Sequence, residues 1–320
     1  MNHVIHDDIG LLRALIGDGR PLLIFSGLAL ILSGGFALFI SANGQFLPHD
    51  VDYLGMTAAQ LCEIRDCRVV HFMFHDRVSF GGALIAVGSL YMWMAAFPLR
   101  RGEAWAWWLF VVSGIAGFGS FLAYLGYGYL DTWHGSATLL LLPCFIVGLI
   151  RSHALVVEPG SLRSLFTPSV RVPWRSRFGI GRLCLLGTAA GMIAGGLTIM
   201  VVGMTSVFVP QDLTFMGLTA TDLQAINSHL VPLIAHDRAG FGGGIGTCGI
   251  VVMFCVWCGR PSRSLWQVLC VAGVVGFACA IGVHPAVGYT EFSHLAPAFA
   301  GAIVFLIGLV LSFKPMNTFA

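Results

Sequence analysis

Eight long apolar segments, separated by short polar ones, decide what this chain can fold into. They run over residues 21–42, 69–97, 105–127, 133–151, 181–205, 229–258, 264–284 and 292–313. About 20 apolar residues are enough to cross the hydrocarbon core of a bilayer as a helix. The segments lack the alternation of barrel strands, and only helices and closed barrels satisfy every backbone hydrogen bond inside a membrane. We therefore expect eight transmembrane helices.

The composition excludes most other classes of protein. Only 10% of the 320 residues are charged and 57% are hydrophobic, whereas about 25% are charged in a typical soluble domain. So few charges cannot cover the surface of a soluble enzyme, and they also exclude a disordered chain. No basic cluster interleaves with aromatic residues, so nucleic acid is not an expected partner. The expected fold class is an all-α integral membrane protein whose partner is the lipid bilayer.

The positive charges gather at one set of alternate helix ends. Thirteen of the 17 cations lie there: Arg13, Arg20, Arg100, Arg101, Arg151, Arg163, Arg171, Arg175, Arg177, Arg182, Arg260, Arg263 and Lys314. The other four lie at the opposite ends: Arg65, Arg68, Arg77 and Arg238. Because cytoplasmic loops are enriched in Arg and Lys, we predict a multi-pass protein of a bacterial-type inner (plasma) membrane with both termini in the cytoplasm.

The same pattern divides the chain into five parts. Residues 1–20 are expected to form a cytoplasmic amphipathic segment that lies on the membrane surface. Residues 21–151 form a first four-helix unit, and residues 181–313 form a second. Residues 152–180, rich in Arg, Ser and Pro, are a cytoplasmic linker between the units, and 314–320 are a cytoplasmic tail.

The two units are copies of one another, as self-comparison of the sequence shows. Residues 46–61 and 208–223 share seven identities in sixteen positions. Further blocks repeat at nearly the same offset: His75-Asp76-Arg77 with His236-Asp237-Arg238, Phe80-Gly81-Gly82 with Phe241-Gly242-Gly243, and His134 with His294. Each unit has an even number of spans, so both enter the membrane from the same side. We expect two parallel four-helix-bundle repeats, side by side.

Four repeated histidines are the main candidates for a site. His75 and His236 lie near the outer ends of the second and sixth segments, and His134 and His294 near those of the fourth and eighth. Ionisable residues at membrane depth are costly and usually functional. Two imidazoles that face each other across a bundle can ligate a haem iron from both sides. Metal or haem ligation is our first interpretation of these four residues, and structural hydrogen bonding is the alternative.

The residues beside these histidines have two interpretations each. Asp76, Arg77, Asp237 and Arg238 are expected to form a structural ion-pair network, although Arg77 and Arg238 could instead bind haem propionates. The Phe-Gly-Gly blocks suit either close helix packing or the approach of a flat cofactor to the backbone.

Further histidines and cysteines occur in only one unit. His71 is an alternative ligand or a neighbour of one, whereas His49, His229 and His284 are interpreted as interfacial residues. Two cysteines share the first outer loop, in a predicted oxidising compartment, and are a disulfide candidate: Cys62 and Cys67. The pair Cys255 and Cys258 lies within a span and is interpreted as packing.

This layout resembles the haem A synthase family. The resemblance rests on eight spans in two parallel units, on His75, His134, His236 and His294 at the four ligand positions, and on the cysteine pair of the first outer loop. The stretch Met56-Thr57-Ala58-Ala59-Gln60-Leu61 also looks like family sequence. The chain departs from the family by inserting Asp76 between the second-helix His and Arg, and by lacking a Glu about one turn earlier.

The resemblance implies a membrane haem protein with one or two haems, b-type, bound between His75 and His134 and between His236 and His294. If the protein is an enzyme, the implied reaction is oxidation of a haem substituent, an oxidoreductase activity with electrons delivered through the second haem. The alternative is a parallel-repeat transporter, or a non-catalytic subunit with partners in a larger, respiratory-type membrane complex. The polar groups lie at the outer rim rather than mid-membrane, which counts against transport.

Overall fold

The computed structural model describes residues 10–122, 129, 131–157 and 161–318, and within these ranges the regular structure is helical, without strands. The α-helices are α1 (Leu11–Ile16), α2 (Arg20–Ala42), α3 (Pro48–Leu54), α4 (Ala58–Cys62), α5 (Arg68–Ala96), α6 (Ala104–Leu122), α7 (Thr132–Ser152), α8 (Arg177–Met204), α9 (Pro210–Met216), α10 (Ala220–Ile226), α11 (Leu230–Cys258), α12 (Arg263–Val287) and α13 (Phe292–Thr318). Eight of them are long and apolar enough to cross a membrane: α2, α5, α6, α7, α8, α11, α12 and α13.

These eight helices confirm the eight predicted apolar segments, with ends that differ by a few residues. The third segment was expected to extend to residue 127, and its last residues, 123–127, lie outside the described part of the chain. The eighth helix is longer than expected because it continues through Lys314 to Thr318.

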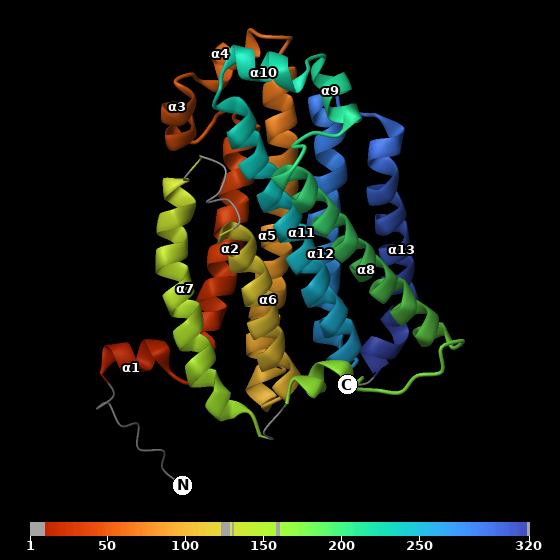
Figure 1. Cartoon of the computed structure of the whole chain (residues 1–320). Coiled ribbons are helices and arrows are strands. Elements are labelled where there is room, and N and C mark those ends of the chain that lie inside the picture. The colour runs from red at the N-terminus through yellow and green to blue at the C-terminus, as the bar shows by residue number, and fades with distance from the viewer. Residues whose placement is uncertain (1–9, 123–128, 130, 158–160, 319–320) are drawn as a thin grey trace.

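Four of the five short helices, α3, α4, α9 and α10, cover one end of the molecule, which we call the capped end (Figure 1). Equivalent local signals build them in both units. Helices α3 and α9 begin at a proline and stop at a glycine with φ near +65°, Gly55 and Gly217, a conformation that side chains disfavour. Helices α4 and α10 begin with capping boxes, Thr57 with Gln60 and Thr219 with Asp222.

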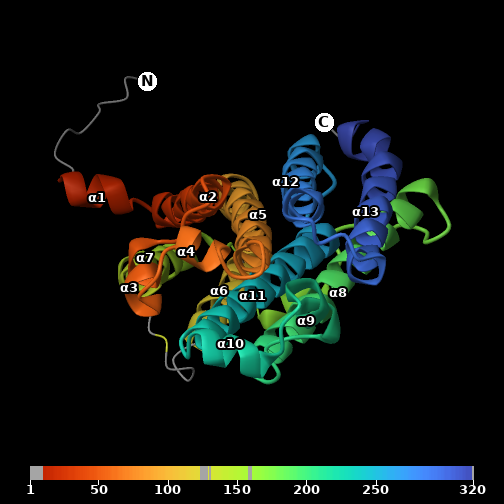
Figure 2. The same cartoon turned by 90° about the horizontal axis from the view of Figure 1, so that it is seen from above.

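Two helices, α5 and α11, stand together in the middle of the molecule and separate its two halves (Figure 2). We call this pair the central wall. Helices α2, α6 and α7 lie on one side of the wall, and α8, α12 and α13 lie on the other. The wall helices are the most buried of the eight, with 61% of each apolar window inside the protein.

Each wall helix packs closely on the first helix of its own unit through facing glycines. A Cβ added at Gly34 of α2 would lie 2.4 Å from the carbonyl oxygen of Gly81 in α5. In the second unit, a Cβ at Gly242 of α11 would lie 2.6 Å from the carbonyl oxygen of Gly196 in α8. Backbones can approach this closely only where both residues lack a side chain.

The next glycine of each Phe-Gly-Gly block packs on the other unit. A Cβ at Gly82 would lie 2.5 Å from Cβ of Cys279 in α12, and one at Gly243 would lie 2.3 Å from Oγ of Ser120 in α6. The structure therefore supports the packing interpretation of both blocks. It also differs from the expected pair of self-contained bundles, because α5 packs on α12 and hardly contacts α6, while α11 packs on α6.

The end opposite the capped end holds α1 and the linker. Leu11, Leu12 and Leu15 of α1 are exposed, and the position of this segment on a membrane surface stays a prediction. Part of the linker packs against the helices: Leu165 is buried, and Arg182 donates hydrogen bonds to the carbonyl oxygens of Val170 and Trp257. These contacts hold the linker against the ends of α8 and α11.

Alanine substitutions at Gly34 and Gly35 test the packing of the wall. Gly34→Ala would insert a methyl group against α5 and should destabilise the protein by about 1–3 kcal/mol. Gly35→Ala is the matched control, because no atom lies within 4 Å of a Cβ at that position. It should be neutral or stabilising by up to about 1 kcal/mol. Thermal unfolding in detergent measures both, and equal unfolding temperatures would contradict the close contact.

Candidate functional site

The buried acids and histidines, together with Arg238, gather near the capped end, on both sides of the central wall. Two cavities flank the wall there and are lined mainly by apolar residues. Chamber 1, of about 250 Å³, lies among α2, α5, α6, α7 and α11. Chamber 2, of about 770 Å³, lies among α5, α8, α11, α12 and α13. Each chamber is therefore built from three helices of one unit together with the whole wall.

Arg77 of α5 joins the two units on the side of chamber 1. Its Nε donates to Asp237 Oδ2 of α11 at 2.8 Å, and its Nη1 lies 2.8 Å from Asp50 Oδ2 in α3. The side chain of Arg77 is 12% exposed, so both ion pairs are largely shielded from solvent. Its guanidinium group is thus held by one carboxylate from each unit.

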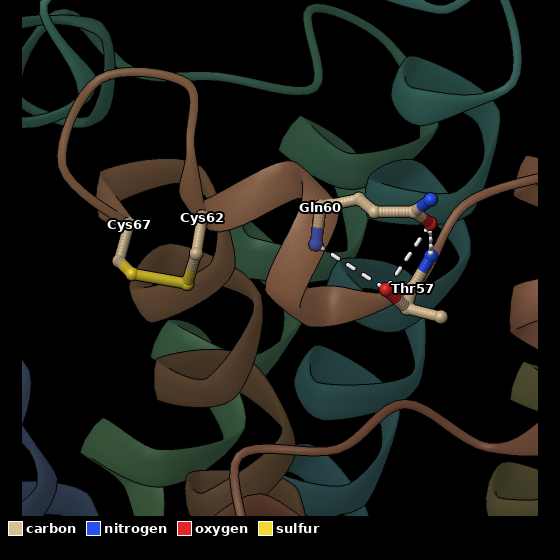
Figure 3. The surroundings of a disulfide bond; sticks show 4 residues. All are labelled: Thr57, Gln60, Cys62 and Cys67. Atoms are coloured by element: carbon tan, nitrogen blue, oxygen red, sulfur yellow. Dashed lines mark hydrogen bonds between the residues drawn. A yellow bond between two sulfur atoms is a disulfide. The ribbon is translucent and has the colours of Figure 1, made fainter.

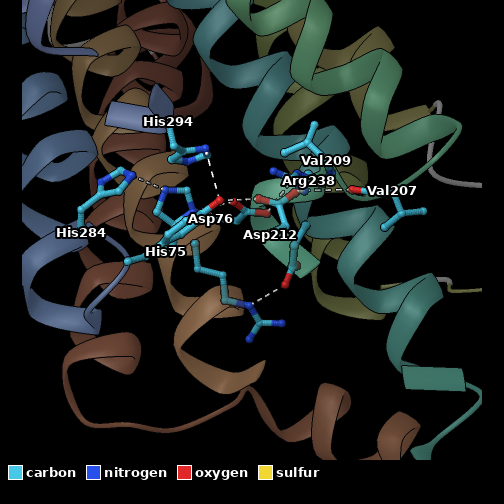
Figure 4. A network of polar contacts seen from close by, with 11 residues as sticks. His75, Asp76, Val207, Val209, Asp212, Arg238, His284 and His294 are labelled. Atoms are coloured by element: carbon cyan, nitrogen blue, oxygen red, sulfur yellow. Dashed lines mark hydrogen bonds and ion pairs between the residues drawn. The ribbon is translucent and has the colours of Figure 1, made fainter. Parts of the chain in front are cut away.

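Arg238 of α11 makes the equivalent contacts on the side of chamber 2, with one carboxylate of its own unit and one of the first unit (Figure 4). It is bonded to Asp212 of α9, its Nη1 donates to the carbonyl oxygen of Val207 at 3.0 Å, and its Nε lies 3.8 Å from Asp76 Oδ2 of α5. Asp212 in turn caps α9 by accepting the N–H of Val209. Both arginines thus form ion pairs, as expected, and their binding to propionates stays a prediction.

A tyrosine completes each of these networks. Tyr129 donates its hydroxyl hydrogen to Asp50, and Tyr289 donates to Asp212 at 2.9 Å. Burial, reinforced by the neighbouring carboxylate, raises the pKa of Tyr129 and of Tyr289 well above the ordinary value. Both tyrosines therefore remain protonated donors that hold the carboxylates in place.

Asp131, His134 and His236 meet at the capped end of chamber 1, and we call them the Asp-His-His cluster. His134 Nδ1 lies 2.5 Å from Asp131 Oδ2 and 3.3 Å from His236 Nε2. Asp131 Oδ2 and His236 Nε2 are 3.4 Å apart. Asp131 also begins α7, because its Oδ1 accepts the backbone N–H of His134 at 2.9 Å. The helix cap therefore sets the direction of this carboxylate.

A fourth side chain supports this cluster. His49 Nε2 of α3 lies 3.1 Å from Asp131 Oδ1 and 3.4 Å from Asp50 Oδ1. Burial disfavours the ionised form of Asp131, but hydrogen bonds with His134, His236 and His49 outweigh it and hold the pKa of this carboxyl well below its usual range. Asp131 is thus a carboxylate among three imidazoles.

His75, His284 and His294 form a second cluster, the three-His cluster, at the capped end of chamber 2 (Figure 4). His75 Nδ1 donates to Asp76 Oδ1 at 2.9 Å, and His75 Nε2 lies 3.1 Å from His284 Nε2. The ring of His294 has its centroid 5.5 Å from that of His75. One ligand atom from each of the three histidines lies within 4.8 Å of the others.

The histidines therefore pair differently from the expectation. We expected His75 beside His134 and His236 beside His294, within each unit. The structure instead brings His75 together with His294, and His236 together with His134, across the two units. The reason is the central wall: each wall helix presents its histidine to the chamber of the other unit.

Sequence reasoning missed two members of the clusters and one neighbour that supports them. His284 was interpreted as interfacial, yet it is 4% exposed and part of the three-His cluster. Asp131 was not singled out, and His49, whose counterpart in the second unit is Gln211, was interpreted as interfacial. A signal for Asp131 was present, since the spacing Tyr-x-Asp-x-x-His at 129–134 recurs as Tyr-x-Glu-x-x-His at 289–294.

The other candidates lie outside the two clusters. The structure joins Cys62 to Cys67 by a disulfide at the capped end, between α4 and α5, next to the Thr57 capping box (Figure 3). His71 lies one turn before His75. It belongs to none of the groups of acids and histidines, among the described residues, that are close enough to hold a metal ion. His229 contacts the carbonyl oxygen of Tyr53 instead.

Comparison of the chain with protein-family models, with curated proteins and with solved structures finds no match in any of the three. The function must therefore be argued from the residues and their arrangement.

A double-mutant cycle on Arg77 and Asp237 tests the ion pair between the units. Arg77→Met would leave two carboxylates buried without a cation and should cost about 3–5 kcal/mol of stability. Adding Asp237→Asn removes one of these carboxylates, so the double variant should be more stable than the sum of the single losses by about 0.5–3 kcal/mol.

The control for this cycle is Arg101→Gln, at the opposite end of the molecule. Arg101 contacts Glu103 at 2.7 Å but is 42% exposed, so its loss should cost no more than about 1 kcal/mol. Unfolding in detergent measures all four variants, and additive effects at Arg77 and Asp237 would contradict a direct pair.

Proposed function

We propose that this protein is an integral membrane haem protein that holds one b-type haem in chamber 2, with His75 and His294 as the axial ligands. The observation that carries the proposal is the three-His cluster at the capped end of a large chamber that glycines of α8 line. Helix-bundle cores are a common location for haem, and imidazoles are among its usual ligands.

The dimensions of chamber 2 suit a flat cofactor. Its volume of about 770 Å³ falls within the range of about 300–1,000 Å³ found for small-molecule sites. Gly187, Gly191 and Gly195 line it from one face of α8, and no atom lies within 4 Å of a Cβ added at any of them. Side chains at these positions would fill the space that the macrocycle needs.

The surroundings of His75 suit a ligand to iron. Because Asp76 accepts the hydrogen of Nδ1, Nε2 is left as the coordinating atom of a residue that lines chamber 2. Asp76, which departs from the family pattern, would thereby orient the ligand and increase its basicity. His284, whose Nε2 is 3.1 Å from that of His75, is the competing second ligand.

Chamber 1 suits a haem less well. Its volume of about 250 Å³ is below the usual range of about 300–1,000 Å³. Five phenylalanines occupy its walls: Phe36, Phe80, Phe118, Phe121 and Phe145. Haem ligation by His134 and His236 therefore stays a prediction and is not part of this proposal.

We further propose that the eight helices cross a bacterial-type inner membrane as a parallel repeat, with both termini in the cytoplasm and the capped end outside. Helix α1 and the C-terminal end of α13 lie at the same end of the molecule (Figure 1). Most Arg and Lys residues are on that side, and the disulfide is at the other, which fits an oxidising compartment. The equivalent contacts of Arg77 and Arg238 support a two-fold relation between the units.

The resemblance to haem A synthase supports the same assignment and suggests an oxidoreductase or electron-transfer role. A bound haem would supply one-electron chemistry. The chain's own residues would bind and orient it: His75 and His294 as ligands, and Asp76 as the group that fixes the His75 tautomer.

The absorption spectrum of the detergent-purified protein, expressed with a supply of haem, tests the proposal. We expect a Soret band corresponding to about one haem per chain. His294→Ala should abolish or strongly shift it, because an axial ligand is lost. His134→Ala is the matched control at the equivalent position of the first unit, and it should leave the band unchanged.

Two results would count against this assignment. Absence of a Soret band from folded wild-type protein would show that the protein binds no haem under these conditions and would contradict the proposal. Loss of the band in His134→Ala with retention in His294→Ala would move the haem to chamber 1. A His284→Ala variant completes the set, since loss there alone would identify His284 as the second ligand.

A further inference from the structure

We infer that the Asp-His-His cluster binds one divalent transition-metal ion at the capped end of chamber 1. This site is separate from the haem proposed for chamber 2, and it does not depend on that proposal. Two imidazoles and one carboxylate are the ligand set of mononuclear non-haem iron(II) sites and of some zinc sites.

The three ligand atoms are spaced as such an ion requires. Asp131 Oδ2, His134 Nδ1 and His236 Nε2 form a triangle with sides of 2.5, 3.3 and 3.4 Å. With metal–ligand bonds of about 2.0–2.1 Å, neighbouring ligands lie about 3.3 Å apart in a tetrahedron and about 2.9 Å apart in an octahedron. An ion can therefore touch all three atoms after small side-chain adjustments.

The charge around chamber 1 also calls for a cation. Three carboxyl groups line this side of the wall, Asp50, Asp131 and Asp237, and the guanidinium group of Arg77 contacts two of them. Asp131 has no ion pair with an arginine or lysine among the described residues, and its partners are the imidazoles of His49, His134 and His236. Buried carboxylates are normally paired or bound to metals. In the equivalent network of the second unit, Arg238 lies beside both acids, Asp76 and Asp212.

Contacts to the second carboxylate oxygen of Asp131 also fix the orientation of this ligand. The helix cap of α7 fixes one oxygen of Asp131, and His49 lies 3.1 Å from the same oxygen, so the other oxygen is left for the ion. Such contacts behind a ligand are typical of metal sites and orient the ligand. In the second unit, Glu291 caps α13 in the same way, but it is exposed and belongs to neither cluster. The carboxylate ligand is therefore particular to the first unit.

Cobalt(II) is a suitable probe, because its visible absorption reports both binding and coordination. The full-length protein, carried on an affinity tag without histidine, would be stripped with a chelator in detergent and titrated with CoCl₂. We expect one ion per chain by elemental analysis. Asp131→Asn and His134→Ala should weaken binding at least about 100-fold, since loss of even a supporting residue costs about 10- to 100-fold. His71→Ala is the matched control, because His71 belongs to neither cluster, and it should bind Co²⁺ normally.

A cysteine variant separates ligation from a structural role. His134 coordinates through Nδ1, the ring nitrogen nearer the backbone, so a cysteine sulfur can take its place with a metal–sulfur bond of about 2.3 Å. His134→Cys should bind Co²⁺ and gain an intense near-ultraviolet sulfur-to-cobalt charge-transfer band. A residue that only stabilises the fold would produce no such band.

The inference is overturned if the folded wild-type protein binds no Co²⁺, or binds it equally well in the Asp131→Asn and His134→Ala variants. Absence of the charge-transfer band from Co²⁺-loaded His134→Cys also overturns it. These results are distinct from a failure of the haem proposal, which concerns the Soret band of the wild type and of His294→Ala.

Discussion

Two buried arginines, each held between carboxylates of both units, are the contacts on which the rest of this structure depends. Arg77 of the first unit is bonded to Asp237 of the second, and Arg238 of the second lies beside Asp76 of the first. A charge at this depth is tolerated only with its partner in place, so the pairs require α5 and α11 to stand together. The glycines below them then allow the surrounding helices to approach the wall. The ion pairs between α5 and α11 thus place these two helices between the two chambers.

The two clusters show how a duplicated site can diverge through a few residues. Both units place a histidine on the second and on the fourth helix, and in each the fourth-helix histidine follows a helix-capping acid. In the first unit that acid is Asp131, which is short enough to cap the helix and still reach both imidazoles. In the second it is Glu291, which caps from the surface, and His284 from α12 enters the cluster instead. The Asp-His-His cluster therefore contains a carboxylate, whereas the three-His cluster is built from imidazoles alone.

The sequence was sufficient to predict the helices and the end of the molecule where the histidines lie. The length and hydropathy of a segment depend on residues close in the chain, and the repeat is visible by aligning the sequence with itself. It was not sufficient to predict which histidines meet. Helical periodicity indicates the face on which His75 lies, but not whether α6 or α12 packs against that face. That choice depends on contacts such as Gly82 with Cys279, between residues far apart in sequence. His284 was missed because no repeated motif marks it, and Asp131 because its counterpart is a different acid.

Because each wall helix lines the chamber of the other unit, neither half of the chain contains a complete cluster. His134 and Asp131 belong to the first unit but meet His236 of the second, and His284 and His294 of the second meet His75 of the first. A chain with a single unit would contain neither cluster. Two copies of such a chain would have to associate, with the second helix of each packed against the other helices of its partner, to form both clusters. Both clusters therefore depend on residues from the two halves of the chain, and a change in either half alters the surroundings of each cluster.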